Sequence, residues 1–178
     1  ADYSWNRGWL IWSSNHYDHA SGYHPNNIIC ENIVVYNIGG AGLGKMVADS
    51  VYFINCDVYN VCDSLTVYDP GGSGTGFTST GRKDKQDDVE NSYTYYYGCR
   101  AWNCSDQGFG NNSAGTTIYE NCWSFNNGNN PFETNVDNKG SGWKFWYWDP
   151  EIVKNPDIVQ LTMHNCIAAH NAFCGINW

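Results

Sequence analysis

Basic residues, long apolar segments and helical periods are all scarce in this chain. Lys and Arg number nine against 18 Asp and Glu, giving a formal net charge of −9, which argues against nucleic acid as a partner. No run of 18 apolar residues occurs, so the sequence predicts no membrane-spanning segment. The eight cysteines form no CxxC pair, so a zinc site is not expected. With apolar residues rarely at helical spacing, the sequence favours strands.

A short phrase recurs five times, as CENIVVYN, NCDVYNV, GCRAWNC, NCWSFNN and NCIAAHN. Its shared column is occupied by Ile33, Cys56, Cys99, Cys122 and Cys166. Successive members of this column are 23, 43, 23 and 44 residues apart. A unit of about 23 residues therefore alternates with one that carries roughly 20 extra residues, as expected for loops that project from a stacked solenoid.

Short β-branched or aromatic runs, bounded by Asn and Gly, precede each phrase. A coil of this length with three short strands is the unit of a right-handed parallel β-helix, so we predict an all-β solenoid of about six coils. Residues 1–178 form a single domain in this interpretation. Because Ala1 and Trp178 fall at mid-coil positions, we expect the chain to be a portion of a longer protein, with continuation of the solenoid or self-association at its ends.

Two features of the phrase predict its structural role. The column just before the cysteines is Asn in four of five coils, and we expect it at a turn with unusual backbone angles. The cysteine column is expected to point inward as a ladder of buried thiols, because buried Cys behaves as a small hydrophobe. Three further cysteines, Cys62, Cys104 and Cys174, lie off this ladder, and the sequence does not say whether they form disulfides.

Each coil also carries a Gly followed by an apolar or aromatic residue, such as Gly108-Phe109 and Gly142-Trp143. Two residues after this Gly we predict an outward column, whose members are Gly44, Thr78, Gly110, Lys144 and Asn177. Lys144 is the one cation in the column. A lysine held on a rigid strand beside bulky aromatics can have its pKa lowered enough to accept a proton. The alternative is an ordinary solvated surface lysine.

The stretch from Trp9 to Trp178 resembles the family 9 polysaccharide lyases, a pectate lyase-like group of right-handed β-helices. The motifs GCRAWNCSDQGF, YENCWSFNNG, GSGWKF and HNCIAAHN match that family's successive coils in order. The resemblance implies calcium-assisted β-elimination on an acidic polysaccharide, in a secreted or cell-surface protein. It places Lys144 at the position of the family's Brønsted base.

The resemblance also implies a calcium site, and here the sequence departs from the family. The pattern Asp-Asp-Gly-x-Asp reads Asp106-Gln107-Gly108-Phe109-Gly110, and Thr75 replaces a further aspartate. Calcium prefers six to eight oxygen ligands, several of them anionic. We therefore expect Asp106 to be a weak remaining ligand of a site that has largely been lost.

Three functions stay open at this point. In the first, the chain is an active lyase in which Lys144 is the base and Arg100, or another cation, neutralises the substrate carboxylate. Alternatively it is a non-catalytic relative that binds polysaccharide, or a structural or adhesin-type β-helix module of an extracellular assembly. Substrate contacts would come from Trp143, Trp146, Trp148 and Asn177. The aromatic segment from Trp143 to Trp148 would equally well cap the core beneath a loop.

Overall fold

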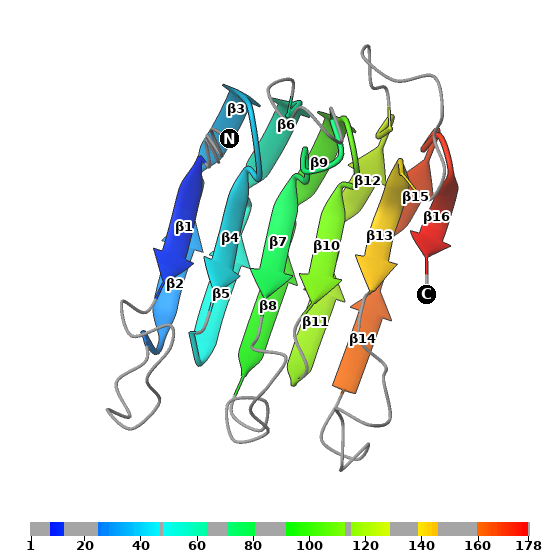
Figure 1. Cartoon of the computed structure of the whole chain (residues 1–178). Helices are drawn as coiled ribbons and strands as arrows, with labels where there is room; N and C mark the ends of the chain where they lie inside the picture. Colours follow the sequence, from blue (N-terminus) through cyan, green and yellow to red (C-terminus); the bar gives the residue numbers. More distant parts are fainter. Residues whose placement is uncertain are drawn as a thin grey trace, which may run out of the picture.

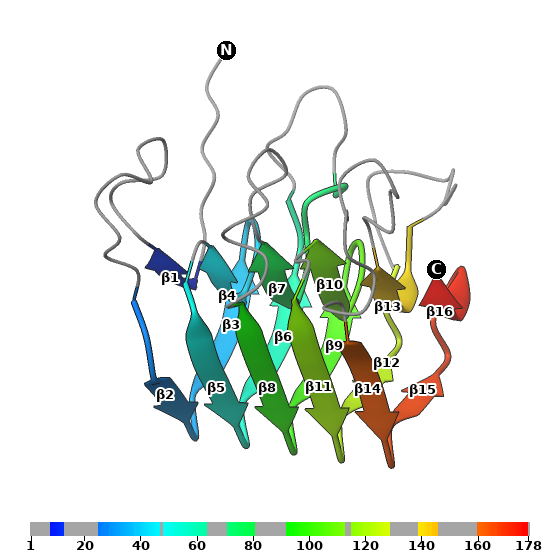
Figure 2. The ribbon, with the colours of Figure 1, turned by 90° about the horizontal axis from the view of Figure 1, so that it is seen from below.

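The fold was obtained as a computed structural model, which describes residues 8–12, 25–46, 48–63, 71–80, 92–112, 115–128, 139–145 and 160–177. Its strands form three parallel sheets, and each coil contributes one strand to each sheet in turn (Figures 1 and 2). None of the described segments forms a helix with the length and apolar character needed to cross a membrane. The parallel β-helix predicted from the repeat is confirmed.

The three sheets have six, five and five strands in the described residues. Sheet A contains β1 (Trp9–Trp12), β4 (Leu43–Met46), β7 (Phe77–Thr80), β10 (Phe109–Asn112), β13 (Ser141–Phe145) and β16 (Cys174–Asn177). Sheet B contains β2 (Ile28–Glu31), β5 (Ser50–Ile54), β8 (Tyr93–Tyr97), β11 (Thr116–Glu120) and β14 (Gln160–His164). Sheet C contains β3 (Val34–Ile38), β6 (Asp57–Val61), β9 (Arg100–Cys104), β12 (Trp123–Phe125) and β15 (Ile167–Ala169).

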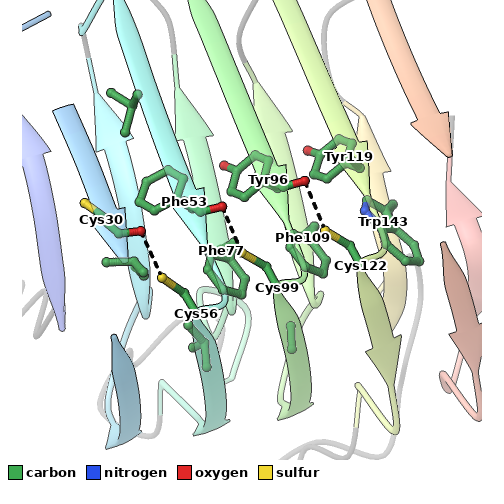
Figure 3. Close-up of a cluster of buried hydrophobic side chains, with 14 of the residues drawn as sticks. Cys30, Phe53, Cys56, Phe77, Tyr96, Cys99, Phe109, Tyr119, Cys122 and Trp143 are labelled. Atoms are coloured by element: carbon green, nitrogen blue, oxygen red, sulfur yellow. Dashed lines mark hydrogen bonds between the residues drawn. The ribbon is translucent and has the colours of Figure 1, made fainter. Parts of the chain in front are cut away.

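Aromatic side chains stack along the axis of the helix inside the core (Figure 3). The rings of Phe77, Phe109 and Trp143 from sheet A lie parallel, with centroids 4.8 and 5.2 Å apart. A second stack from sheet B contains Tyr96 and Tyr119, 4.8 Å apart, and meets the first edge to face. These three distances, 4.8, 5.2 and 4.8 Å, lie close to the separation of neighbouring strands, so the ladder of backbone hydrogen bonds sets the ring distances.

The predicted thiol ladder lies on one wall of this core (Figure 3). Cys56, Cys99 and Cys122 are fully buried, and each thiol donates a hydrogen bond to a carbonyl of the preceding coil at 3.3 to 3.4 Å. All eight cysteines are free, including Cys62, Cys104 and Cys174. Burial raises the pKa of Cys99 and that of Cys104, which keeps both as unreactive thiols at neutral pH.

The asparagine column adopts the left-handed conformation that the sequence led us to expect. Asn32, Asn55, Asn121 and Asn165 have φ between 51° and 56°, and Gly98 takes the same place at 63°. A second asparagine ladder, which the sequence interpretation missed, closes the far end of sheet C. Its members are Asn37, Asn60, Asn103 and Asn126, linked amide to amide along the helix.

The glycine before each inward residue of sheet A is required by close packing. A Cβ on Gly76 would lie 2.5 Å from the carbonyl oxygen of Gly108 and 3.0 Å from Ala101 Cβ. Ala101 belongs to the column of small residues two positions after the cysteines. The glycine column of sheet A and the small column of sheet C thus pack against each other, which explains why both recur in the sequence.

Candidate functional site

The outward column of sheet A is formed as predicted. Strand register places Gly44, Thr78, Gly110, Lys144 and Asn177 side by side on successive coils. Lys144 lies on β13, between Gly110 on β10 and Asn177 on β16. Its side chain is 9% exposed, so this lysine is not an ordinary solvated one. Among the outward strand positions of sheet A that the structure describes, it is the only charged residue.

The residues on either side of Lys144 fix its direction. Trp143 points inward, is 1% exposed and stacks on Phe109, and Phe145 packs against Tyr119 with ring centroids 6.1 Å apart. Because side chains alternate along a strand, two buried neighbours oblige Lys144 to face outward. The prediction that Trp143 contacts substrate is therefore wrong, since the indole belongs to the hydrophobic core. Trp146 and Trp148 lie outside the described residues.

A buried polar turn leads from β9 into β10 on the same side of the molecule as Lys144. Asp106 and Gln107 are each 2% exposed. The backbone N–H of Asp106 donates to the carbonyl of Gly74 at 3.1 Å, and Gln107 Nε2 donates to Thr75 Oγ1 at 3.0 Å. The Gln107 side chain lies across Gly110, where a Cβ would come within 2.8 Å of Nε2. Glycine at 110 therefore gives Gln107 its room, in the coil next to Lys144.

This donor set fits calcium poorly. The amide nitrogen of Gln107 donates to Thr75 Oγ1, and the Gln107 Oε1 atom, although it has no hydrogen-bond partner among the described residues, is an uncharged oxygen. Within the same residues, no three His, Cys, Asp or Glu side chains gather in a way that could hold a metal ion. One carboxylate and one amide oxygen fall short of the several anionic ligands that calcium takes. We therefore assign no step of a reaction to calcium at this turn.

Arg100 is not brought together with Lys144. It lies on β9 of sheet C, whereas Lys144 lies on β13 of sheet A. Its guanidinium forms a bidentate ion pair with Asp57, in which Nε donates to Oδ1 at 2.6 Å and Nη2 to Oδ2 at 2.5 Å. The hydrogen bond to Asp57 raises the pKa of Arg100. The predicted partnership of Arg100 with Lys144 is therefore not supported by the geometry.

A second lysine on sheet A escaped the sequence interpretation. Lys45 on β4 is 1% exposed and points into the core. Its Nζ donates to Ser92 Oγ at 2.7 Å and to the carbonyls of Ala48 and Tyr93 at 3.1 and 3.3 Å. Burial lowers the pKa of Lys45 to about 7, opposed by the charge of Asp49. In the next coils Ser79 and Asn111 occupy the same inward position and bond to threonines of sheet B.

The stacked strands, the outward lysine and the turn at Asp106 define a protein of the pectate lyase-like β-helix class. The family model described as the Pel9A-like right-handed beta-helix region matches residues 13–178, so the chain belongs to that family. This match confirms the resemblance and the right-handed fold. No curated protein and no solved structure gives a significant match to the chain.

Proposed function

We propose that this domain cleaves acidic polysaccharide by β-elimination, with the amine of Lys144 as the base. The observation that carries the proposal is the placement of Lys144 on the outer face of a rigid sheet, with its two chain neighbours anchored in the core. A base is effective when its position is fixed relative to the proton it removes. Membership of a pectate lyase-like family supports a polysaccharide as the substrate.

The proton transfers of the reaction require one base and one returned proton. The neutral Nζ of Lys144 takes the C5 proton of a uronic acid residue, a double bond forms between C4 and C5, and the C4–O4 bond breaks. The leaving oxygen is then protonated, either by water or by the ammonium group that has just formed. The low exposure of Lys144 supports this role because a buried side chain is held in one position relative to the substrate.

Asn177 supplies the neighbouring contact in this proposal. It lies one coil beyond Lys144 in the same outward column, about 4.8 Å along the axis. An amide both donates and accepts hydrogen bonds, as a sugar hydroxyl requires. We assign it to substrate binding and leave Arg100 out of the site. Since polysaccharides of this kind lie outside cells, we further propose that the domain works as a secreted or cell-surface protein.

The test is the ultraviolet absorbance of the unsaturated product when the chain is incubated with polyuronates of several kinds. Comparison of wild type with Lys144→Met separates chemistry from binding, since Met has a similar length but no base. Product from the wild type alone is expected. Product from neither protein, on any substrate, would refute the lyase proposal for this chain.

A non-catalytic structural or adhesin-type module is the second candidate, and one feature of sheet C favours it. The outward rings of Tyr36, Tyr59, Trp102 and Phe125 form a continuous stack, with centroids 5.2, 4.5 and 5.5 Å apart and planes within 9° of parallel. Rings stacked in this way cover each other's faces, so they reinforce the solenoid rather than offer a platform for sugars. Electron microscopy for end-to-end association would test this candidate.

A further inference from the structure

The polar turn beside Lys144 bears on which sugar the site accepts, provided that the proposed function holds. Where the family pattern has carboxylates, this chain has the amide of Gln107 and the hydroxyl of Thr75, which are 2% and 7% exposed and hydrogen bonded to each other. Both groups are neutral at every pH of interest. Asp106 is then the one anionic group of the turn, which falls short of the several anionic ligands that would hold a calcium ion to neutralise a substrate carboxylate.

The described outward strand positions of sheet A carry no second cation that would replace that positive charge. Along the outward strand positions of sheet A, the residues of the three coils nearest Lys144 are Thr78, Gly110 and Asn177, all uncharged. Lys144 itself must be neutral to accept a proton. Arg100 lies on another sheet and is already paired with Asp57. The whole chain moreover carries a net charge of −9, which repels a polyanion.

The chemistry of the C5 proton explains why the charge next to the base matters for the choice of substrate. Removal of that proton beside a free carboxylate places a second negative charge on the same small group. Removal beside a neutral ester produces a single negative charge, delocalised over the ester carbonyl. The α-proton of an ester is correspondingly more acidic, so elimination from the ester needs no cation to offset a carboxylate charge.

We infer that the site around Lys144 takes a uronate residue whose carboxyl group is a neutral ester, as in a methyl-esterified polyuronate. Gln107 is the residue that makes the distinction. Its buried amide donates to Thr75 and adds no negative charge to the turn, so Gln107 acts by leaving the turn without a second carboxylate and not by contact with the sugar. A carboxylate at this position would favour the calcium-dependent reaction on the free acid instead.

The experiment compares highly methyl-esterified pectin with the same pectin after mild alkaline de-esterification, each with EDTA and with added calcium chloride. Product is followed by ultraviolet absorbance. The inference predicts a rate on the esterified polymer at least about tenfold higher than on the free acid, with EDTA causing no loss. Product from the free acid alone, dependent on calcium, would overturn the inference and leave the proposed lyase function intact. No product from either polymer would instead refute the proposed function.

Two variants make the test sharper. Gln107→Glu has nearly the same shape but adds a carboxylate next to Asp106, and we expect it to bind terbium, measured by luminescence, and to shift the preference toward the free acid. An unchanged preference, in a variant with the circular dichroism of wild type, would overturn the role of Gln107. Lys144→Met, in affinity electrophoresis, should be retarded more by the esterified gel than by the de-esterified one. Equal or reversed retardation would count against the inference without any need for activity.

Discussion

Two lysines on sheet A point in opposite directions, although their positions in the repeat differ by only one residue. Lys45 follows its coil's glycine, Gly42, by three residues, and Lys144 follows Gly142 by two. Because strand side chains alternate, this single step turns Lys45 into the core and Lys144 onto the outer face. Lys45 bonds to backbone carbonyls and Ser92, whereas Lys144 lies between Gly110 and Asn177 in the outward column. Register, rather than residue type, separates a structural lysine from a candidate base.

Replacement of Lys144 should produce the largest effect and the clearest contrast. We expect Lys144→Met to lower the rate of product formation by about 10²–10⁴, the usual contribution of a general base. The fold should persist, because the core contacts of Trp143 and Phe145 are unchanged. Product formation and the midpoint of thermal unfolding are measured on the same sample. Activity equal to wild type would show that Lys144 is not the base.

Replacement of Lys45 should act on stability instead. In Lys45→Met the carbonyls of Ala48 and Tyr93 lose their donor inside the core, and we expect a loss of about 1–3 kcal/mol in the free energy of unfolding. Activity per folded molecule should stay that of wild type. Denaturant titration measures the first quantity and the ultraviolet assay the second. An increase in stability would mean that desolvation of the amine outweighs its hydrogen bonds.

The low pKa of Lys45 predicts that its contribution to stability depends on pH. The pKa of Lys45 is about 7 in the folded chain against an ordinary value of 10.5, so between these values the unfolded chain binds a proton that the folded chain does not. Stability attributable to Lys45 therefore rises with pH across this window, by at most about 1.4 kcal/mol per unit. The difference in unfolding free energy between wild type and Lys45→Met, measured from pH 7 to pH 10, should grow. A constant difference would contradict the lowered pKa.

The sequence predicted the features that repeat from coil to coil. It missed those that depend on whether a side chain points into the core or outward. Coil number, the thiol ladder and the asparagine turn follow from spacing alone, because stacked coils place equivalent residues in register. The sequence interpretation places Trp143 in contact with substrate. Trp143 nevertheless occupies the same strand position as Phe77 and Phe109, and the alternation of side chains directs this position into the core. Lys45 was missed because a lysine is expected at the surface, and no repeat marks the oxygen atoms that surround it.

Arg100 illustrates a different limit of the sequence. Arg100 follows a core cysteine, so the sequence predicts that its side chain points outward. The sequence does not show which of the three sheets contains it. Sheets A and C face different sides of the solenoid (Figure 1), so two outward cations need not meet. The repeat spacing shows which residues occupy equivalent positions in successive coils. It does not show which of these columns lie next to each other in the folded chain.

Arg100 also provides the smallest expected effect and completes the comparison of cations. Its side chain is 52% exposed and its ion pair with Asp57 lies at the surface, where such pairs contribute about 0–1 kcal/mol. Arg100→Gln should therefore change the unfolding free energy by no more than that, and should leave product formation unchanged. A rate loss similar to that of Lys144→Met, with the fold preserved, would instead place Arg100 in the reaction. Taken with the two lysine variants, a small effect here would show that neither charge nor an outward direction is sufficient for function. The position on the outer face of sheet A would then be the property that distinguishes Lys144 from the other two cations.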